Sequence, residues 1–301
     1  MNYYNEIKTK LIDNEVYKRV KDYSKNKNDL STYYEVGKLL ILAQGGEARA
    51  KYGDGLIKEY SKRLTEEIGI KYNITTLKRM RQFYLIVEKG APLAHQLTWS
   101  HYTELLPLND INEINYYIKI ISEQCLSKRQ LRERIKNKEY QRLDDNTKLK
   151  LINKEEIDIG DNIKNPIIIK SKPGIDTENI SEKILQNLIL EDIPSFLKEL
   201  GEGFSFIENE YKIKIGNTYN YIDLLLFNYI YNSFVVIELK VCNLKKEHIG
   251  QIQVYMNYID KHIKGINQDK TIGIIITRRD NHYYIQYSSD SRIYTRDYVL
   301  C

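Results

Sequence analysis

Hydrophobic periodicity changes once along this chain of 301 residues, and that change limits the folds available to it. Through residues 1–142 apolar side chains recur every three or four positions, as at Leu56, Tyr60 and Leu64, which is typical of amphipathic helices. Beyond about Thr177, short apolar runs typical of strands alternate with helical stretches. The sequence therefore predicts an all-α domain followed by an α/β domain, and the length suits two domains.

The stretch between these halves differs from both. Residues 143–175 are charged and rich in Asn, and Pro166 and the Pro173-Gly174 pair punctuate them. This composition predicts a linker with one short strand at 167–169. The predicted organisation is a helical domain over 1–142, the linker over 143–175 and a second domain over 176–301.

Each predicted domain divides further into elements. In the first, helices are expected at 55–68, at 73–88 (capped by Asn73 or Thr75), and at 99–106, 110–124 and 127–140, where Ser127 begins a capping box. In the second we expect a helix at 178–200, strands at 204–215, 219–228 and 233–241, a helix at 245–263, a strand at 271–277 and a closing hairpin of 283–289 with 292–299. This order predicts a mixed sheet in which the strand after the helix packs beside the earlier ones.

Composition excludes several classes of protein. The chain is 42% hydrophobic and 29% charged, which is too apolar for a disordered protein. No apolar run reaches the roughly 18–20 residues of a membrane span, and the N-terminus lacks a signal-peptide core. Cys125, Cys242 and Cys301 are far apart and odd in number, so neither a disulfide framework nor a cysteine metal site is expected. We expect a cytoplasmic protein without membrane partners.

Charge is divided unevenly between the halves. Residues 1–142 hold 26 Lys and Arg against 18 Asp and Glu, whereas residues 143–301 hold the remaining 20 against 23. A basic half is typical of a protein that binds a polyanion, and an acidic half is compatible with carboxylate chemistry. Solvated lysines on an ordinary helical domain would explain the same numbers, and charge alone does not decide between these interpretations.

The acidic half contains carboxylates inside otherwise apolar strands. Asp223 begins the run YIDLLLF, and Glu238 and Lys240 share one face of VVIELK. Two carboxylates that converge can hold Mg²⁺ (or Mn²⁺), while the lysine orients a water or neutralises developing charge. A buried Glu–Lys ion pair is the alternative, and Glu-x-Lys alone is not diagnostic because it recurs at Glu6 and Glu210.

The next helix adds polar side chains at helical spacing. Gln251 and Tyr255 are four residues apart, so they lie on one face, and His248 is one turn earlier. Such a pair could position DNA phosphates or the lysine. The pattern is weak alone and moderately specific downstream of Asp…Glu-x-Lys.

Together these residues resemble the PD-(D/E)XK nucleases with the RecB-type Gln-x-x-x-Tyr extension, and more closely the YhcG-type nuclease-domain proteins. The resemblance implies a restriction-endonuclease-like α/β core and a metal-dependent DNA phosphodiesterase. It further implies that Asp223, Glu238 and the Leu239 carbonyl hold the metal, that Lys240 is the catalytic lysine, and that Gln251 and Tyr255 belong to the site. It is carried by FLKELGEGFSFI (196–207), YIDLLLF, VVIELK and HIGQIQVYMNYID (248–260), and in the first half by KYGDGLIKEYSKRLTEEIG (51–69), LKRMRQFY (77–84), QLTWSHYTELL (96–106) and SKRQLRERI (127–135).

The sequence departs from that family at one position. Members often present a glutamate from the first core helix, and the matching residue here is Gln186, with Glu182 one turn earlier. A neutral glutamine weakens a second metal site, which leaves one-metal and two-metal chemistry open. It also keeps a second hypothesis, a catalytically weak or inactive nuclease-fold module that binds DNA or a protein partner.

The basic half supplies candidate DNA-binding residues. Residues 56–88 resemble a helix-turn-helix, although two ordinary bundle helices with solvated charges fit equally well. A second basic run begins at Lys128, where phosphate contacts are as well supported as base contacts. The expected partner is DNA, with branched DNA among the candidates, RNA not distinguished and a homodimer as a candidate assembly. The candidate DNA-binding residues are Lys62, Arg63, Lys71, Lys78, Arg79, Arg81, Lys128, Arg129 and Arg132.

Overall fold

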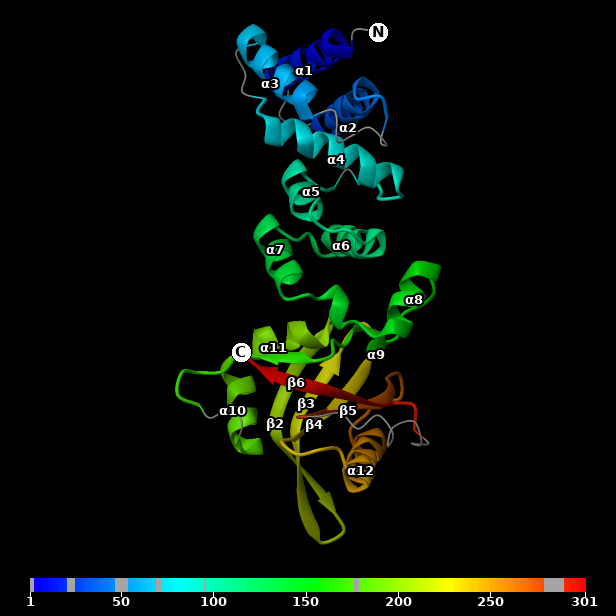
Figure 1. Cartoon of the computed structure of the whole chain (residues 1–301). Coiled ribbons are helices and arrows are strands. Elements are labelled where there is room, and N and C mark those ends of the chain that lie inside the picture. Colours follow the sequence, from blue (N-terminus) through cyan, green and yellow to red (C-terminus); the bar gives the residue numbers. More distant parts are fainter. Residues whose placement is uncertain are drawn as a thin grey trace. The chain divides into compact units, whose positions relative to one another are not determined.

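The computed structural model describes residues 3–20, 25–46, 54–68, 72–94, 96–175, 179–278 and 290–301. The chain divides into two compact units, Met1–Tyr140 and Gln141–Cys301 (Figure 1). Within the described ranges, no helix combines the length and the apolar character that crossing a membrane requires.

The first unit is entirely helical among its described residues, as the periodicity predicts. At Gly37 the second helix lies so close to the fourth that a Cβ atom there would be 2.2 Å from the main-chain oxygen of Met80. Phe83 packs its ring against Trp99 and Tyr102, which joins the fourth helix to the fifth. The helices are α1 (Tyr3–Val20), α2 (Lys25–Ala43), α3 (Asp54–Ile68), α4 (Ile74–Glu88), α5 (Trp99–Leu105), α6 (Ile111–Gln124) and α7 (Lys128–Lys136).

Local capping explains where several helices begin and end. The side chain of Asn73 accepts a hydrogen bond from the Thr76 amide and starts α4, and Ser127 and Gln130 form the predicted capping box of α7. The predicted helix over 127–140 ends earlier, at Lys136, because Lys138 adopts a positive φ of 52°. A short 3₁₀ helix, η2 (Tyr140–Arg142), follows.

The segment expected to be a linker contributes to the second unit. It contains α8 (Asp145–Asn153), α9 (Ile159–Asn162) and the predicted short strand, β1 (Ile167–Ile169), which pairs in parallel with β6. Ile163 and Ile167 are buried in the core of this unit. The segment is therefore packed chain and not a free spacer.

A mixed six-stranded sheet forms the centre of the second unit. The strand order is β1-β6-β5-β4-β3-β2, with antiparallel pairing among β2, β3 and β4 and parallel pairing among β4, β5, β6 and β1. The predicted position of the strand after the helix, beside β4, is confirmed. Residues 283–289, the first half of the predicted closing hairpin, lie outside the described residues. The remaining strands are β2 (Phe204–Ile215), β3 (Thr218–Asn228), β4 (Ser233–Lys240), β5 (Asp269–Thr277) and β6 (Ile293–Leu300).

Helices cover both faces of this sheet. α10 (Glu182–Glu191) and α11 (Ile193–Leu200) contribute to the apolar core that contains Leu224, whereas α12 (Lys246–His262) packs on the core that contains Leu225 (Figure 1). Because successive strand residues point to opposite faces, β3 contributes side chains to both cores. The single helix predicted over 178–200 is wrong as one element, because Asp192 leaves helical geometry (φ −136°) and caps α11 instead.

Candidate active site

The two predicted carboxylates meet where β3 and β4 separate. The last paired residues of the two strands are Leu224 and Ile237, so Asp223 and Glu238 follow at opposite positions. From that point the Leu239 amide donates a 2.7 Å hydrogen bond to Oδ2 of Asp223. The sheet itself therefore places Asp223 beside Glu238.

Glu238 lies in a costly environment for a negative charge. Its side chain is almost fully buried, and its Oε1 atom has no hydrogen-bond partner among the described residues. Burial, and then the nearby charge of Asp223, raise the pKa of Glu238 to about 8. Burial also raises the pKa of Asp223, although the Leu239 N–H and the Lys240 charge oppose this shift. The carboxylate pair therefore needs a compensating positive charge.

Lys240 supplies only part of that compensation. Its Nζ atom lies 3.4 Å from Oε2 of Glu238 and 3.5 Å from Oε2 of Glu182. Burial acts to lower the lysine pKa, but Glu238, Glu182 and Asp223 outweigh burial and raise it above the usual value. Lys240 therefore stays an ammonium group. The Glu–Lys ion pair of the alternative interpretation is present, yet among the described residues it leaves one oxygen of Glu238 unpartnered.

Helix α10 brings Gln186 and Glu182 to the same site. The Gln186 side chain is buried, donates a 3.0 Å hydrogen bond to the main-chain oxygen of Asp223, and accepts one of 3.2 Å from Lys183. The amide thus holds the strand at Asp223 through its backbone. Glu182, one turn earlier, contacts the site through Lys240 and is half exposed.

Helix α12 contributes the predicted Gln251–Tyr255 pair. Nε2 of Gln251 donates a 3.0 Å hydrogen bond to the hydroxyl of Tyr255. Burial raises the pKa of Tyr255, and the charges of Glu238 and Asp223 raise it further. The charge of Lys240 also acts on His248: burial, and then this charge, lower the pKa of the imidazole. The helix therefore borders the carboxylate site, and Gln251 and Tyr255 share one face of it, as their spacing predicts.

Two residues at the site were not singled out from the sequence. Lys183 bonds both Gln186 and Glu210, and the negative charge of Glu210 raises the pKa of Asp223. Glu210 faces this region because β2 and β3 pair around the turn at Gly216. The register of that hairpin, read from the turn, is the signal that could have found Glu210.

A divalent cation fits these residues. No cluster of three His, Cys, Asp or Glu side chains suited to a metal occurs in the part of the chain that the structure describes. Two converging carboxylates are nevertheless present, and one has a buried oxygen without a partner in that same part of the chain. Oxygen donors suit Mg²⁺ or Mn²⁺, and a cation here would offset the burial of both charges.

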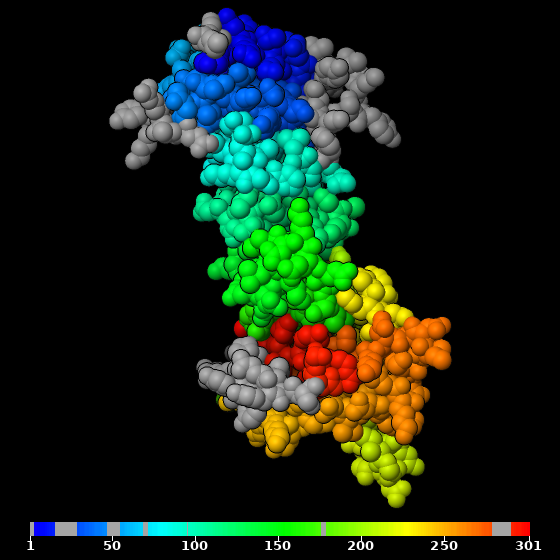
Figure 2. Space-filling view, turned by 90° about the vertical axis from the view of Figure 1, so that its right-hand side faces the viewer, coloured from blue at the N-terminus to red at the C-terminus, as the bar shows by residue number. Residues whose placement is uncertain are grey.

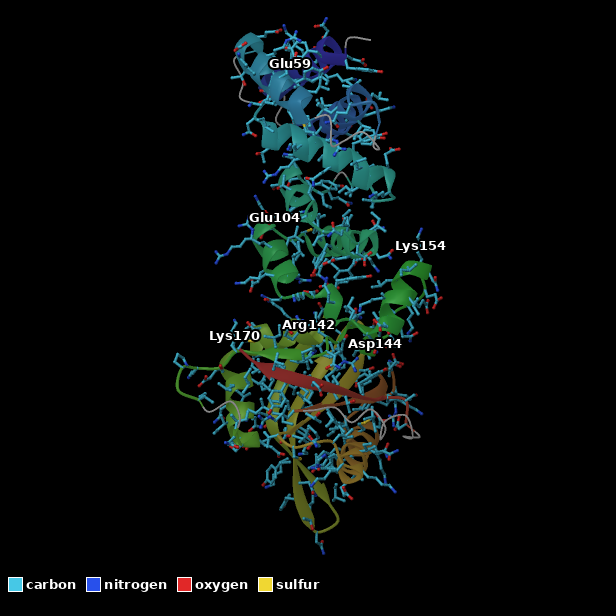
Figure 3. The ribbon with its side chains drawn as sticks, in the orientation of Figure 1. Glu59, Glu104, Arg142, Asp144, Lys154 and Lys170 are labelled. Carbon is cyan, nitrogen blue, oxygen red and sulfur yellow. The ribbon has the colours of Figure 1, made fainter. Side chains whose placement is uncertain are left out.

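Most predicted DNA-binding residues of the first unit are already engaged. Arg63 lies between Glu59 and Glu67 and stacks over Tyr4, and Glu104 forms ion pairs with both Lys128 and Arg132. Figure 3 labels Glu59 and Glu104 among the side chains of this unit. Lys62 lies 3.9 Å from Glu66, and Arg81 donates to the side chain of Gln44. Lys78, Arg79 and Arg129 are exposed on α4 and α7. Lys71, in the turn of the expected helix-turn-helix, lies outside the described residues, so that motif stays a prediction.

Family models match both halves of the chain. Residues 163–298 match the YhcG PDDEXK nuclease domain, so the second unit belongs to a class of hydrolytic nucleases that generally use divalent metals. Residues 9–142 match the DUF1016 N-terminal domain. The chain belongs to the YhcG-type PD-(D/E)XK nuclease-domain proteins, with both domains in the order expected of that family.

One curated relative aligns with most of the chain. It is "Putative nuclease YhcG" of Escherichia coli (strain K12), which is 26% identical over 285 residues, covering 82% of this chain and 76% of that protein.

Two solved structures align with a smaller part. One is a repair endonuclease from Pyrococcus abyssi, which is 21% identical and aligns over 40% of this chain and 47% of that chain. The other is the EndoMS–dsDNA2 complex, which is 19% identical and aligns over 41% of this chain and 48% of that chain. The TM-score is 0.29 for both. The alignment spans less than half the length of each of these proteins.

Proposed function

We propose that the chain is a metal-dependent DNA endonuclease that hydrolyses phosphodiester bonds at Asp223, Glu238 and Lys240. The observation that carries this proposal is the buried oxygen of Glu238, unpartnered among the described residues and beside the half-buried carboxylate of Asp223. A structural ion pair would leave that oxygen orphaned at a cost, whereas a cation site accounts for it.

Mg²⁺, or Mn²⁺ in its place, is the proposed cofactor. Asp223, Glu238 and the main-chain carbonyl of Leu239 are its proposed ligands. When bound, such an ion supplies a Lewis acid that polarises a phosphate and lowers the pKa of a water molecule. Gln186 bonds the main chain and Glu182 is engaged by Lys240, so the arrangement favours one cation over two.

The chain's own groups would act on the phosphate as follows. Lys240, held as an ammonium group beside Glu238, donates to a phosphate oxygen and neutralises charge that develops there. Gln251 donates to the Tyr255 oxygen, which leaves the Tyr255 hydroxyl proton to bond a phosphate oxygen. Gln186 is a positioning residue that fixes β3 at Asp223.

The first unit is proposed to bind the DNA. The exposed side chains of Lys78 and Arg79 on α4 and of Arg129 on α7 are the candidates for phosphate contacts. All three cysteines are exposed and free, which supports a reducing, cytoplasmic setting. Branched DNA and a homodimer belong to this proposal as well.

Metal-dependent cleavage of duplex, branched and single-stranded DNA tests the nuclease assignment. We expect Lys240→Ala to reduce cleavage by about 100-fold or more, the usual loss for an electrostatic catalytic group. Lys261→Ala, at an exposed position of α12, is the matched control and should cleave as the wild type does. Equal cleavage by Lys240→Ala and wild type, with Mg²⁺ and with Mn²⁺, would show the catalytic assignment to be wrong.

A nuclease-fold module that binds without cutting is the second candidate. Gln186 favours it, because that side chain adds no carboxylate to the site. Calorimetric titration of Mg²⁺ or Mn²⁺ separates the candidates. The endonuclease should bind a cation that Asp223→Asn abolishes, whereas a binding-only module should show no such site and no cleavage.

A further inference from the structure

The β2–β3 hairpin extends beyond the rest of the sheet. Pairing of β3 with β4 ends at Leu224, whereas its pairing with β2 continues to the turn, where Thr218 faces Ile215. Residues 211–222 therefore form a two-stranded extension, called here the hairpin arm. Figure 1 shows the arm projecting past the sheet, and in Figure 2 its yellow-green tip stands clear of the surface of the second unit.

One face of the arm carries two lysines and two tyrosines. Lys212 pairs with Tyr221 and Lys214 with Tyr219, so all four side chains lie on the same face. Each tyrosine is 52% exposed, so both rings are accessible to a ligand. Nζ of Lys212 lies 3.9 Å from the centre of the Tyr219 ring, and neither lysine forms an ion pair with a described residue. The face is aromatic and positively charged.

This face is continuous with the carboxylate site. Tyr219, Tyr221 and Asp223 are alternate residues of β3, so they form one row along the strand. Alternate strand residues are about 7 Å apart. That spacing is about twice the 3.4 Å between stacked bases of a duplex, so the two rings suit successive unstacked bases and not a stacked pair.

We propose that the hairpin arm binds single-stranded DNA that continues from the phosphate to be cleaved at Asp223. Successive bases stack on Tyr221 and Tyr219, and Lys212 and Lys214 neutralise the phosphates between them. The arm from Tyr211 to Tyr221 contains no acidic residue, which fits a polyanion. The location of the cleaved phosphate rests on the proposed function. The substrate class that follows is DNA in which a single-stranded tail joins a duplex.

Equilibrium binding of the full chain, in EDTA so that no cleavage occurs, tests this inference. The probes are a blunt duplex and the same duplex with an oligothymidylate tail of about ten nucleotides, within the usual site size of such proteins. Wild type should bind the tailed duplex more tightly. Because Tyr219→Ala/Tyr221→Ala removes both stacking rings, it should lower the tailed-to-blunt affinity ratio by about 30-fold, and Phe at both positions should restore the ratio.

Two further variants sharpen the experiment. Tyr229→Ala is the matched control, since Tyr229 is 66% exposed but lies beyond the other end of β3, and the ratio should not change. Lys212→Gln/Lys214→Gln should lower the salt dependence of tail binding by about 1.4 in the log–log slope, the value for two single-strand phosphates.

Three outcomes would overturn the arm as a tail-binding site: no wild-type preference for the tail, an unchanged ratio in the double alanine variant, or an equal loss in Tyr229→Ala. Because binding is measured without metal, its result is independent of cleavage. A chain that cuts no DNA with Mg²⁺ or Mn²⁺ yet shows the tyrosine-dependent preference would refute the nuclease and leave the arm supported.

Discussion

Glu238 should make the metal-free protein less stable as pH rises. Its folded-state pKa is raised from the usual 4.5 to about 8, so the folded state binds this proton more tightly than the unfolded state does. The stabilisation that comes from this tighter proton binding is fully present below pH 4.5. It decreases as pH rises and is lost once pH has risen through 8. At about 1.4 kcal/mol for each pKa unit, the loss between pH 5 and pH 8 is about 3 kcal/mol.

Glu238→Gln isolates this contribution because it keeps the shape of the side chain and removes the charge. In EDTA, the variant should gain about 3 kcal/mol of stability relative to wild type between pH 5 and pH 8. Hydrogen exchange of β4 peptides measures the second unit. Fluorescence of Trp99, the single tryptophan, reports the first unit and should not distinguish wild type from variant. The matched control is Glu202→Gln, an exposed position of the same unit.

Added Mg²⁺ or Mn²⁺ should favour wild type over Glu238→Gln at pH 8, which is the opposite of the result expected in EDTA. A cation favours the ionised carboxylate, so wild type should gain more protection at pH 8 than Glu238→Gln does. If the difference between wild type and variant does not change with pH in EDTA, Glu238 is not held protonated by its surroundings. The electrostatic reasoning for the site would then be refuted.

Three other changes have defined outcomes. Gln186→Glu should strengthen Mn²⁺ binding by adding a carboxylate beside Asp223, and calorimetry that finds equal or weaker affinity would contradict this. Gly37→Ala should destabilise the first unit by about 1–3 kcal/mol, because the new methyl group would clash with the main chain of α4. Gly55→Ala is the control, since its methyl group meets nothing within 4 Å. Equal melting temperatures for the two variants would contradict the close packing at Gly37. Arg142→Ala should lower the free energy of unfolding by up to about 3 kcal/mol, because the mostly buried carboxylate of Glu199 loses its ion-pair partner. Denaturant unfolding that matches wild type would argue against that ion pair.

Local patterns predicted the elements of the second unit well. The strand expected over 204–215 has those bounds in the structure, because its mixture of apolar and polar residues and the turn at Gly216 are both encoded locally. The approach of Asp223 to Glu238 could also be predicted, since it follows once neighbouring strands pair in the expected register.

Features that depend on distant contacts were harder to predict. The apolar residues on both sides of Asp192 would also fit one continuous helix. Whether Asp192 continues that helix or caps a second one depends on the packing of the whole unit. The ion pairs of Glu104 with Lys128 and Arg132 join two different helices, so the sequence shows these charges without showing that they are partners. The contact from Gln186 to the Asp223 backbone is of the same kind.

The bond from the Leu239 amide to Asp223 affects how mutants of this site should be interpreted. Where β3 and β4 separate, the Leu239 amide has no main-chain acceptor on the neighbouring strand β3. The Asp223 carboxylate accepts its hydrogen bond instead. Asp223→Ala therefore removes a backbone acceptor together with a candidate ligand, and its loss of activity would combine folding with chemistry. Asp223→Asn keeps an oxygen for the amide and removes only the charge. Asparagine is thus the substitution at this position that separates architecture from catalysis.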